Sequence, residues 1–157
     1  ARYHNVYGPY GTYDGGREKA PAAVCRKVVA AQLSGSGQIE IWGDGEQTRS
    51  FTYIDDCLQG TLRLMDSGVD EPLNVGSDQL VTINQLVDIV ERIAGVSLKR
   101  HYKLDAPKGV RGRNSDNTLI TQRLGWAPSI RLEDGMRRTY EWIHREMTTT
   151  GARRVFA

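Results

Sequence analysis

The chain has 157 residues, with 21 Lys and Arg against 19 Asp and Glu, and 39% of its residues are hydrophobic. This length favours one domain with a real core, and a net charge of only +2 argues against a nucleic-acid-binding surface. No apolar run approaches the roughly 20 residues of a membrane span. Two cysteines, Cys25 and Cys57, are too few for a disulfide scaffold, so we expect reduced thiols in a cytoplasmic protein.

The predicted elements alternate between strands and helices. In chain order they are a strand at 2–7, a helix at 22–32, strands at 38–42 and 50–54, a helix at 56–65, a strand at 72–75, a helix at 83–93, a strand at 98–104, and helices at 118–124 and 132–147. Residues 148–157 are expected to form a frayed tail. Alternation of this kind predicts an α/β fold.

Local signals set several of these boundaries. Pro21 suits the first turn of a helix, and Asp55 or Asp56 is expected to cap the helix that follows it. Thr82 is expected to cap an amphipathic helix, which Gly95 then ends. The tryptophans lie beside glycines or on apolar faces, so core packing is predicted for all three, namely Trp42, Trp126 and Trp142. The histidines lack metal-ligand spacing, so no metal site is predicted at His4, His101 or His144.

A Glu-Lys pair follows a glycine-rich loop. Glu18 and Lys19 precede the predicted helix that carries Arg26 and Lys27. A lysine held in a cleft is suited to general acid/base work because its pKa shifts readily on desolvation. The alternative is a solvated helix N-terminus with no chemical role.

Two further segments carry arginines in polar loops. Gln47 and Arg49 lie two residues apart after a tight turn, and so on one side of a strand. Arg111 and Arg113 flank a glycine in the second segment, where Lys108 lies nearby. The arginine fork matches phosphate oxygens, so both segments are candidates for a diphosphate. The alternatives are a surface hairpin and a polar loop that caps the next helix.

The order of these motifs carries a resemblance over about residues 2 to 145. Residues 2–9 (RYHNVYGP), 43–56 (GDGEQTRSFTYIDD) and 73–76 (LNVG) resemble the C-terminal half of extended short-chain dehydrogenase/reductases that act on nucleotide sugars. Residues 15–23 (GGREKAPAA) and 109–117 (GVRGRNSDN) resemble the GDP-mannose 3,5-epimerase family within that superfamily. The resemblance implies the C-terminal substrate-binding lobe of such an enzyme, over residues 1–147.

The resemblance also implies roles. Enzymes of this family use NAD to oxidise C4 of the hexose transiently, after which acid/base residues invert C3 and C5. Lys19 matches the lysine of that acid/base pair, while neither cysteine here matches its partner. The implied substrate-binding residues are Asn5, Glu18, Lys27, Gln47, Arg49 and Arg113, with Arg111 a weaker candidate. A nucleotide sugar, with GDP-mannose favoured, is the implied substrate, and a homodimer is the implied state of the complete enzyme.

Two family features are missing from the sequence. The Gly-x-Gly-x-x-Gly dinucleotide fingerprint lacks its strand-turn-helix context, and no Tyr is followed by Lys four positions later. We therefore expect an N-terminal half with the cofactor site to be absent, and the chain alone to be inactive. The alternatives are another NAD-dependent epimerase, decarboxylase or dehydratase of UDP- or dTDP-sugars, and a non-catalytic nucleotide-sugar-binding module or remnant.

Overall fold

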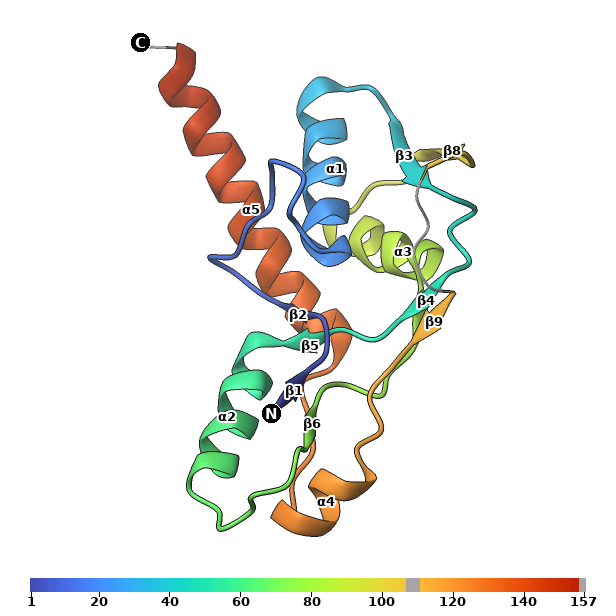
Figure 1. The fold of residues 1–157 in the computed structure, drawn as a ribbon. Helices are drawn as coiled ribbons and strands as arrows, with labels where there is room; N and C mark the ends of the chain where they lie inside the picture. The colour runs from blue at the N-terminus through green and yellow to red at the C-terminus, as the bar shows by residue number, and fades with distance from the viewer. Residues whose placement is uncertain (107–110, 156–157) are drawn as a thin grey trace.

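The computed structural model describes residues 1–106 and 111–155, with side chains up to residue 149. Its helices and short strands alternate as an α/β fold, which confirms the predicted class. The helices are α1 (Ala20–Ser34), α2 (Ile54–Met65), α3 (Ile83–Ala94), α4 (Thr118–Leu124) and α5 (Leu132–Val155) (Figure 1). The strands are β1 (Arg2–Tyr3), β2 (Val6–Tyr7), β3 (Gln38–Trp42), β4 (Thr48–Arg49), β5 (Thr52–Tyr53), β6 (Asn74–Val75), β7 (Val81–Thr82), β8 (Lys99–Lys103) and β9 (Gly112–Arg113).

The described strands form four small sheets. β1 pairs with β6, β2 with β5, and β3 with β8, each pair running parallel. In the remaining sheet β4 lies between β7, which is antiparallel to it, and β9, which is parallel. These parallel pairings join segments that are far apart in sequence, so the sheets tie the chain together over long range.

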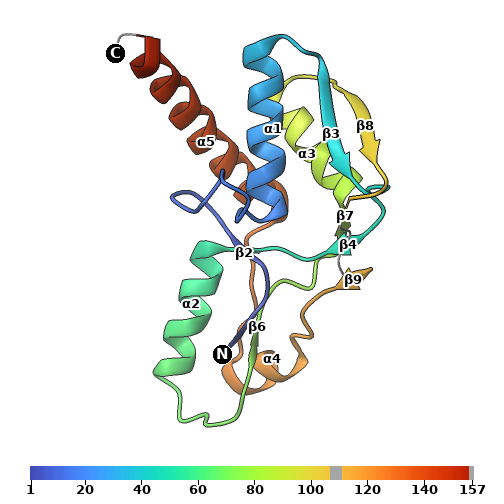
Figure 2. The same ribbon diagram turned by 45° about the horizontal axis from the view of Figure 1, so that its top comes forward.

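The larger core lies where α1, α3 and α5 pack together beside β3 (Figure 2). Val28, Leu86 and Met136, one from each helix, are fully buried there. The capping box that Thr82 makes with Gln85 starts α3, and Gly95 ends it in the left-handed conformation, as predicted. A second, smaller core lies between α2, α4 and β6 and is built on Leu73, Val75, Ile120 and Trp126.

Several boundaries differ from the prediction. The strand expected at 2–7 is split into β1 and β2, because Asn5 takes a positive φ of 32° and turns the chain between two different partner strands. α2 begins at Ile54, so Asp55 and Asp56 lie in its first turn and do not cap it. The Asp56 carboxylate instead accepts hydrogen bonds from the backbone amides of Ser129 and Ile130. α5 continues to Val155, past the predicted end at Met147.

In the part of the chain that the structure describes, no helix combines the length and apolarity needed to cross a bilayer.

Candidate functional site

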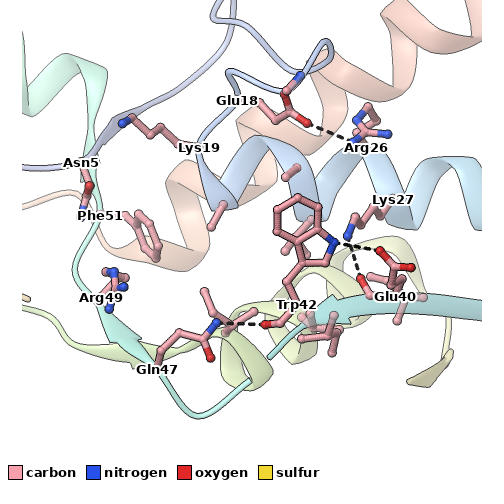
Figure 3. Close-up of a pocket in the computed structure, with 18 residues that line it drawn as sticks. Asn5, Glu18, Lys19, Arg26, Lys27, Glu40, Trp42, Gln47, Arg49 and Phe51 are labelled. Carbon is pink, nitrogen blue, oxygen red and sulfur yellow. Dashed lines mark hydrogen bonds and ion pairs between the residues drawn. The ribbon is translucent and has the colours of Figure 1, made fainter. Parts of the chain in front are cut away.

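A cleft of about 400 Å³ opens between α1, β3 and the segment around β4 (Figure 3). Apolar side chains from three elements line it, among them Val24 of α1, Ile41 of β3 and Val87 of α3. Six of the predicted site residues also line it, namely Asn5, Glu18, Lys19, Lys27, Gln47 and Arg49. The cleft therefore gathers residues from three of the sequence motifs against an apolar wall, which is the usual composition of a small-molecule site.

Lys19 is fixed in place by the start of α1. It occupies the N-cap position with extended backbone angles, and its carbonyl accepts the first helical hydrogen bond from the amide of Ala23 at 3.0 Å. Pro21 lies in the first turn, where its fixed φ favours helix formation at that point. The Lys19 side chain is exposed, and among the described residues no hydrogen bond or ion pair engages its ammonium group. The helix start therefore fixes the Lys19 backbone at the cleft and leaves its side chain exposed.

Glu18 is held by a clamp from α1. Arg26 Nη2 donates to Glu18 Oε1 at 3.0 Å, and the Gly16 amide donates to Glu18 Oε2 at 2.8 Å. Arg26 Nε also donates to the Tyr13 carbonyl at 3.0 Å, so one guanidinium fastens two points of the loop. Partial burial raises the pKa of the Glu18 carboxyl, but hydrogen bonds from backbone amides and Arg26 outweigh it and hold the pKa below its usual value. Glu18 lines the cleft, yet both of its oxygens serve to position the loop that ends in Lys19.

Asn5 reaches the cleft from the turn between β1 and β2. Its side-chain Nδ2 donates to the Ser50 carbonyl at 3.1 Å, and its backbone carbonyl accepts from the Thr52 amide at 3.1 Å. Asparagine tolerates a positive φ better than most residues, which explains its place at this turn. A strained backbone position of this kind beside a cleft is typical of functional sites.

The arginines from two distant segments are neighbours. Arg49 of β4 and Arg113 of β9 are register partners on adjacent parallel strands. The Arg49 side chain lines the cleft and donates to the Thr48 carbonyl, while Arg113 is exposed and is not among the residues that line the cleft. The structure therefore brings together the two phosphate-binding candidates that sequence places 64 positions apart (113 − 49).

Apart from Arg113, the described residues of the segment 109–117 make mainly structural contacts. Arg111 is exposed and does not line the cleft, and its carbonyl accepts from the Thr48 amide. Asp116 accepts from the Thr118 amide at the start of α4, and Ser115 is buried. Lys108 and Gly109 lie outside the described residues.

Trp42 also lines the cleft, which its sequence pattern did not predict. Core packing was predicted for it, but its side chain is 51% exposed, whereas Trp126 and Trp142 are buried as predicted. The strand period carries the missing signal. Ile39 and Ile41 are buried on one face of β3, so the alternation places Trp42 with Glu40 on the opposite, exposed face.

Lys27 lies beside this ring. Its Nζ donates to the Glu40 carbonyl at 2.8 Å and lies 5.8 Å from the centre of the Trp42 ring. Burial lowers the pKa of the Lys27 ammonium, and the negative charge of Glu40 opposes this only in part. The cleft thus has a lysine near each end, Lys19 next to Asn5 and Lys27 next to Trp42 (Figure 3).

Other reactive groups do not assemble into a site. Both cysteines are buried, and burial raises the pKa of each thiol, so neither is a ready nucleophile. Within residues 1–106 and 111–149, no group of three or more His, Cys, Asp or Glu side chains is placed to hold a metal ion.

Comparison with known proteins gives a consistent result. Residues 1–76 match the model of the NAD dependent epimerase/dehydratase family. Over 146 residues the chain is 54% identical to GDP-mannose 3,5-epimerase 1 of Oryza sativa subsp. indica and 53% identical to GDP-mannose 3,5-epimerase of Arabidopsis thaliana. Each of these alignments covers 93% of this chain but only 37% of the relative's length.

Solved structures give the same picture of the fold. The UDP-glucose 4-epimerase of Thermotoga maritima, solved with UDP-glucose, superposes with a TM-score of 0.82 at 32% identity. That superposition covers 93% of this chain and 45% of the other. The chain therefore spans less than half of the proteins it resembles.

Proposed function

Because this chain is a homologue of the GDP-mannose 3,5-epimerases and is related to the NAD-dependent epimerase/dehydratase family, we propose that it forms the nucleotide-sugar-binding part of such an epimerase. The favoured substrate is GDP-mannose, and the proposed chemistry is proton inversion at C3 and C5. The complete enzyme is proposed to act as a homodimer. In the same proposal residues 1–147 form the substrate-binding lobe.

One observation carries the proposal. Lys19, at the start of α1, and Arg49, on β4, line the same cleft although thirty positions separate them in sequence. A nucleotide sugar needs both a cationic site for its diphosphate and, for epimerisation, a proton-transfer group at the sugar. The cleft offers both kinds of group beside one apolar wall.

Arg49 and Arg113 are proposed to bind the diphosphate. A planar guanidinium can hold two phosphate oxygens at once, and a register pair on adjacent strands places two such groups side by side. Arg111 lies two residues from Arg113 in the sequence and is a weaker candidate for the same role. Asn5 and Lys27 are the proposed polar contacts to the remainder of the substrate.

Lys19 is proposed to transfer a proton at the hexose ring. Its side chain is exposed and its ammonium is unengaged by the described residues, while the helix start fixes its backbone beside the cleft. The Glu18 clamp supports this position by fixing the residue that precedes it. Glu18 was expected to contact substrate, and we now propose that it acts mainly as a positioning residue.

The residues described here do not fit the NAD that such enzymes require. A dinucleotide site needs a strand that turns through glycines into a helix N-terminus. α1 follows β2 only after the twelve-residue loop 8–19, and α2 and α3 begin directly after Tyr53 and Thr82, so none of these helix starts is the tight glycine turn of that motif. We therefore propose that residues 1–157 bind a nucleotide sugar without turning it over.

Calorimetric titration of residues 1–157 with GDP tests the binding role. We expect saturable binding that Arg49→Ala weakens about 10- to 100-fold, the value of a charge-assisted hydrogen bond of about 1.5–3 kcal/mol. Arg63→Ala is the matched control, because Arg63 is exposed on α2 and does not line the cleft. Equal affinities for the Arg49→Ala and wild-type chains would contradict the proposal.

The role of Lys19 can be tested in a chimaera. The 146 aligned residues of this chain would replace the corresponding part of the Arabidopsis enzyme, to which they are 53% identical. In a chimaera that catalyses the exchange of sugar protons of GDP-mannose for solvent deuterium, Lys19→Gln should slow that exchange at least about 100-fold. This is the usual contribution of a general acid or base. Lys99→Gln, at an exposed site on β8, is the control. Unchanged exchange in Lys19→Gln would remove Lys19 from the mechanism.

A further inference from the structure

Trp42 exposes a large apolar ring at the rim of the cleft. Its side chain is 51% exposed, against 8% for Trp126 and 9% for Trp142. An indole carries a large apolar surface, so half-exposure is costly unless something else covers the ring. The ring lines the cleft and is not scattered on a remote surface, so a molecule in the cleft can cover it.

The ring is held in one orientation. Its Nε1 donates to Glu40 Oε1 at 2.9 Å, and Lys27 Nζ lies 5.8 Å from the ring centre while donating to the Glu40 carbonyl. Figure 3 shows the ring standing between the labelled Lys27 and the labelled Arg49 in that view. A ring fixed before a ligand arrives loses little freedom when it binds, which favours stacking on a flat partner.

A hydrogen-bond donor and a hydrogen-bond acceptor both lie beside the ring. The Lys27 ammonium is a donor, and the Glu40 carboxylate is an acceptor. Gln47 Nε2 donates to the Trp42 carbonyl at 3.1 Å, whereas Gln47 Oε1 is buried with no hydrogen-bond partner among the described residues. That oxygen is enclosed by protein, so the groups beside the ring that a ligand can reach are those of Lys27 and Glu40.

We infer, on the basis of the proposed function, that Trp42 is the stacking platform for the nucleobase and that Lys27 and Glu40 select guanine. Guanine presents an adjacent carbonyl oxygen and ring N–H, which match a lysine donor and a carboxylate acceptor. Adenine has an amino group and a bare ring nitrogen at the same edge and so mismatches both. Uracil shares guanine's edge but is a single ring that covers less of the indole.

The order of residues along the cleft agrees with a nucleotide sugar lying across it. Trp42 and Lys27 lie at one end, Gln47 and Arg49 follow, and Asn5 and Lys19 lie at the other end (Figure 3). This order along the cleft corresponds to the base, ribose, diphosphate and sugar of the ligand.

Tryptophan fluorescence of residues 1–157 during titration with GDP, UDP and ADP tests this inference. We expect GDP to quench the emission and to bind more tightly than UDP or ADP. Trp42→Ala should weaken GDP binding about tenfold, as base–aromatic stacking typically does, and should remove most of the quenching. Trp42→Phe keeps an aromatic face and should restore most of the affinity, which calorimetry measures without the fluorophore. Trp142→Phe, at a buried position in the larger core, should retain both affinity and quenching.

The outcomes separate this inference from the function on which it rests. If Arg49→Ala loses GDP binding but a folded Trp42→Ala chain binds GDP like the wild type, the base site is overturned and the proposed function stands. If the wild type, folded by circular dichroism, binds none of the three nucleotides, both are overturned. Equal or tighter binding of UDP or ADP overturns the selection of guanine, and Glu40→Gln should narrow the preference for GDP over ADP if the selection is correct.

Discussion

The two halves of the molecule differ in how well they bury their own apolar surface. In the cleft region, formed by α1, α3, α5, β3 and β8, three helices pack over a large shared core. In the α2–α4 region, formed by α2, α4, β1 and β6, the core is much smaller. Val24, Ile41 and Val87 of the better-packed half line the cleft, so its apolar wall is supported by a core that this chain supplies itself.

α2 shows the difference most clearly. It buries Asp56, Cys57 and Gly60, while Leu58, Leu62 and Met65 are all more than half exposed. Polar burial on one side and apolar exposure on the other is the reverse of what an isolated helix face prefers. α2 is therefore well formed locally, while its packing within this chain is incomplete.

Cavity mutations in the two cores should have effects of different size and reach. We expect Leu86→Ala, in the cleft region, to lower the free energy of unfolding by about 3–5 kcal/mol and to loosen the whole cleft region. Ile120→Ala, equally buried, should cost about 2–3 kcal/mol because its small core can collapse around the change. Urea unfolding measures the change in the free energy of unfolding, and hydrogen exchange shows which segments become less protected.

Leu80→Ala is the control for both cavity mutations, because Leu80 is 47% exposed and should change stability by less than about 0.5 kcal/mol. The contrast between the halves would be refuted if Ile120→Ala increased exchange in α1 and α3 as much as Leu86→Ala does.

The substitution Gly60→Ala should destabilise the α2–α4 region without affecting the cleft region. A Cβ on Gly60 would lie 2.6 Å from Trp126 ring atoms and 3.0 Å from Val75, so we expect Gly60→Ala to destabilise by about 1–3 kcal/mol. Gly68→Ala is the matched control, because a Cβ there meets nothing within 4 Å. Thermal unfolding followed by circular dichroism measures both. GDP affinity should stay unchanged in a folded Gly60→Ala chain, and a loss of affinity would show that the two halves are coupled.

The smallest effect is expected within the cleft region, at the Glu18 clamp. Glu18 has a lowered pKa in the folded chain, so its stabilising contribution is present above its ordinary pKa near 4.5 and is lost as pH falls through the folded value. The Gly16 amide resonance, followed by NMR against pH, should therefore titrate with a midpoint below 4.5.

Arg26→Gln should move that midpoint up toward 4.5 and change global stability by no more than about 1 kcal/mol. Arg92→Gln, which removes an exposed ion pair with Glu133, should leave the midpoint in place. A midpoint that is identical in the wild type and Arg26→Gln would mean that the clamp does not act on Glu18.

The elements that could be predicted from sequence are those governed by local rules. The α3 helix has an apolar stripe, a capping box and a terminal glycine, all encoded within fourteen residues from Thr82 to Gly95, and both ends were predicted correctly. The two-residue strands β7 and β9 were not predicted, because such short segments are strands only through their partners. The split of β1 from β2 was missed for the same reason.

The site shows the same division. Residue chemistry and motif order singled out Asn5, Lys19 and Arg49, and these line one cleft. Sequence could not show that Arg49 and Arg113 are strand neighbours, since that depends on the long-range pairing of β4 with β9. Nor could it show that both Glu18 oxygens are taken up by Arg26 and Gly16, because side-chain partners are chosen by packing.

The sequence by itself determined the α/β class, the main helices and the residue types suited to a phosphate-bearing substrate, because periodicity, capping and side-chain chemistry are local properties. The tertiary structure places Trp42 at the cleft and not in the core, and it pairs the two strands that carry Arg49 and Arg113. Those features depend on which face of β3 the helices cover and on which strands pair, and both are set by contacts between segments far apart in the chain.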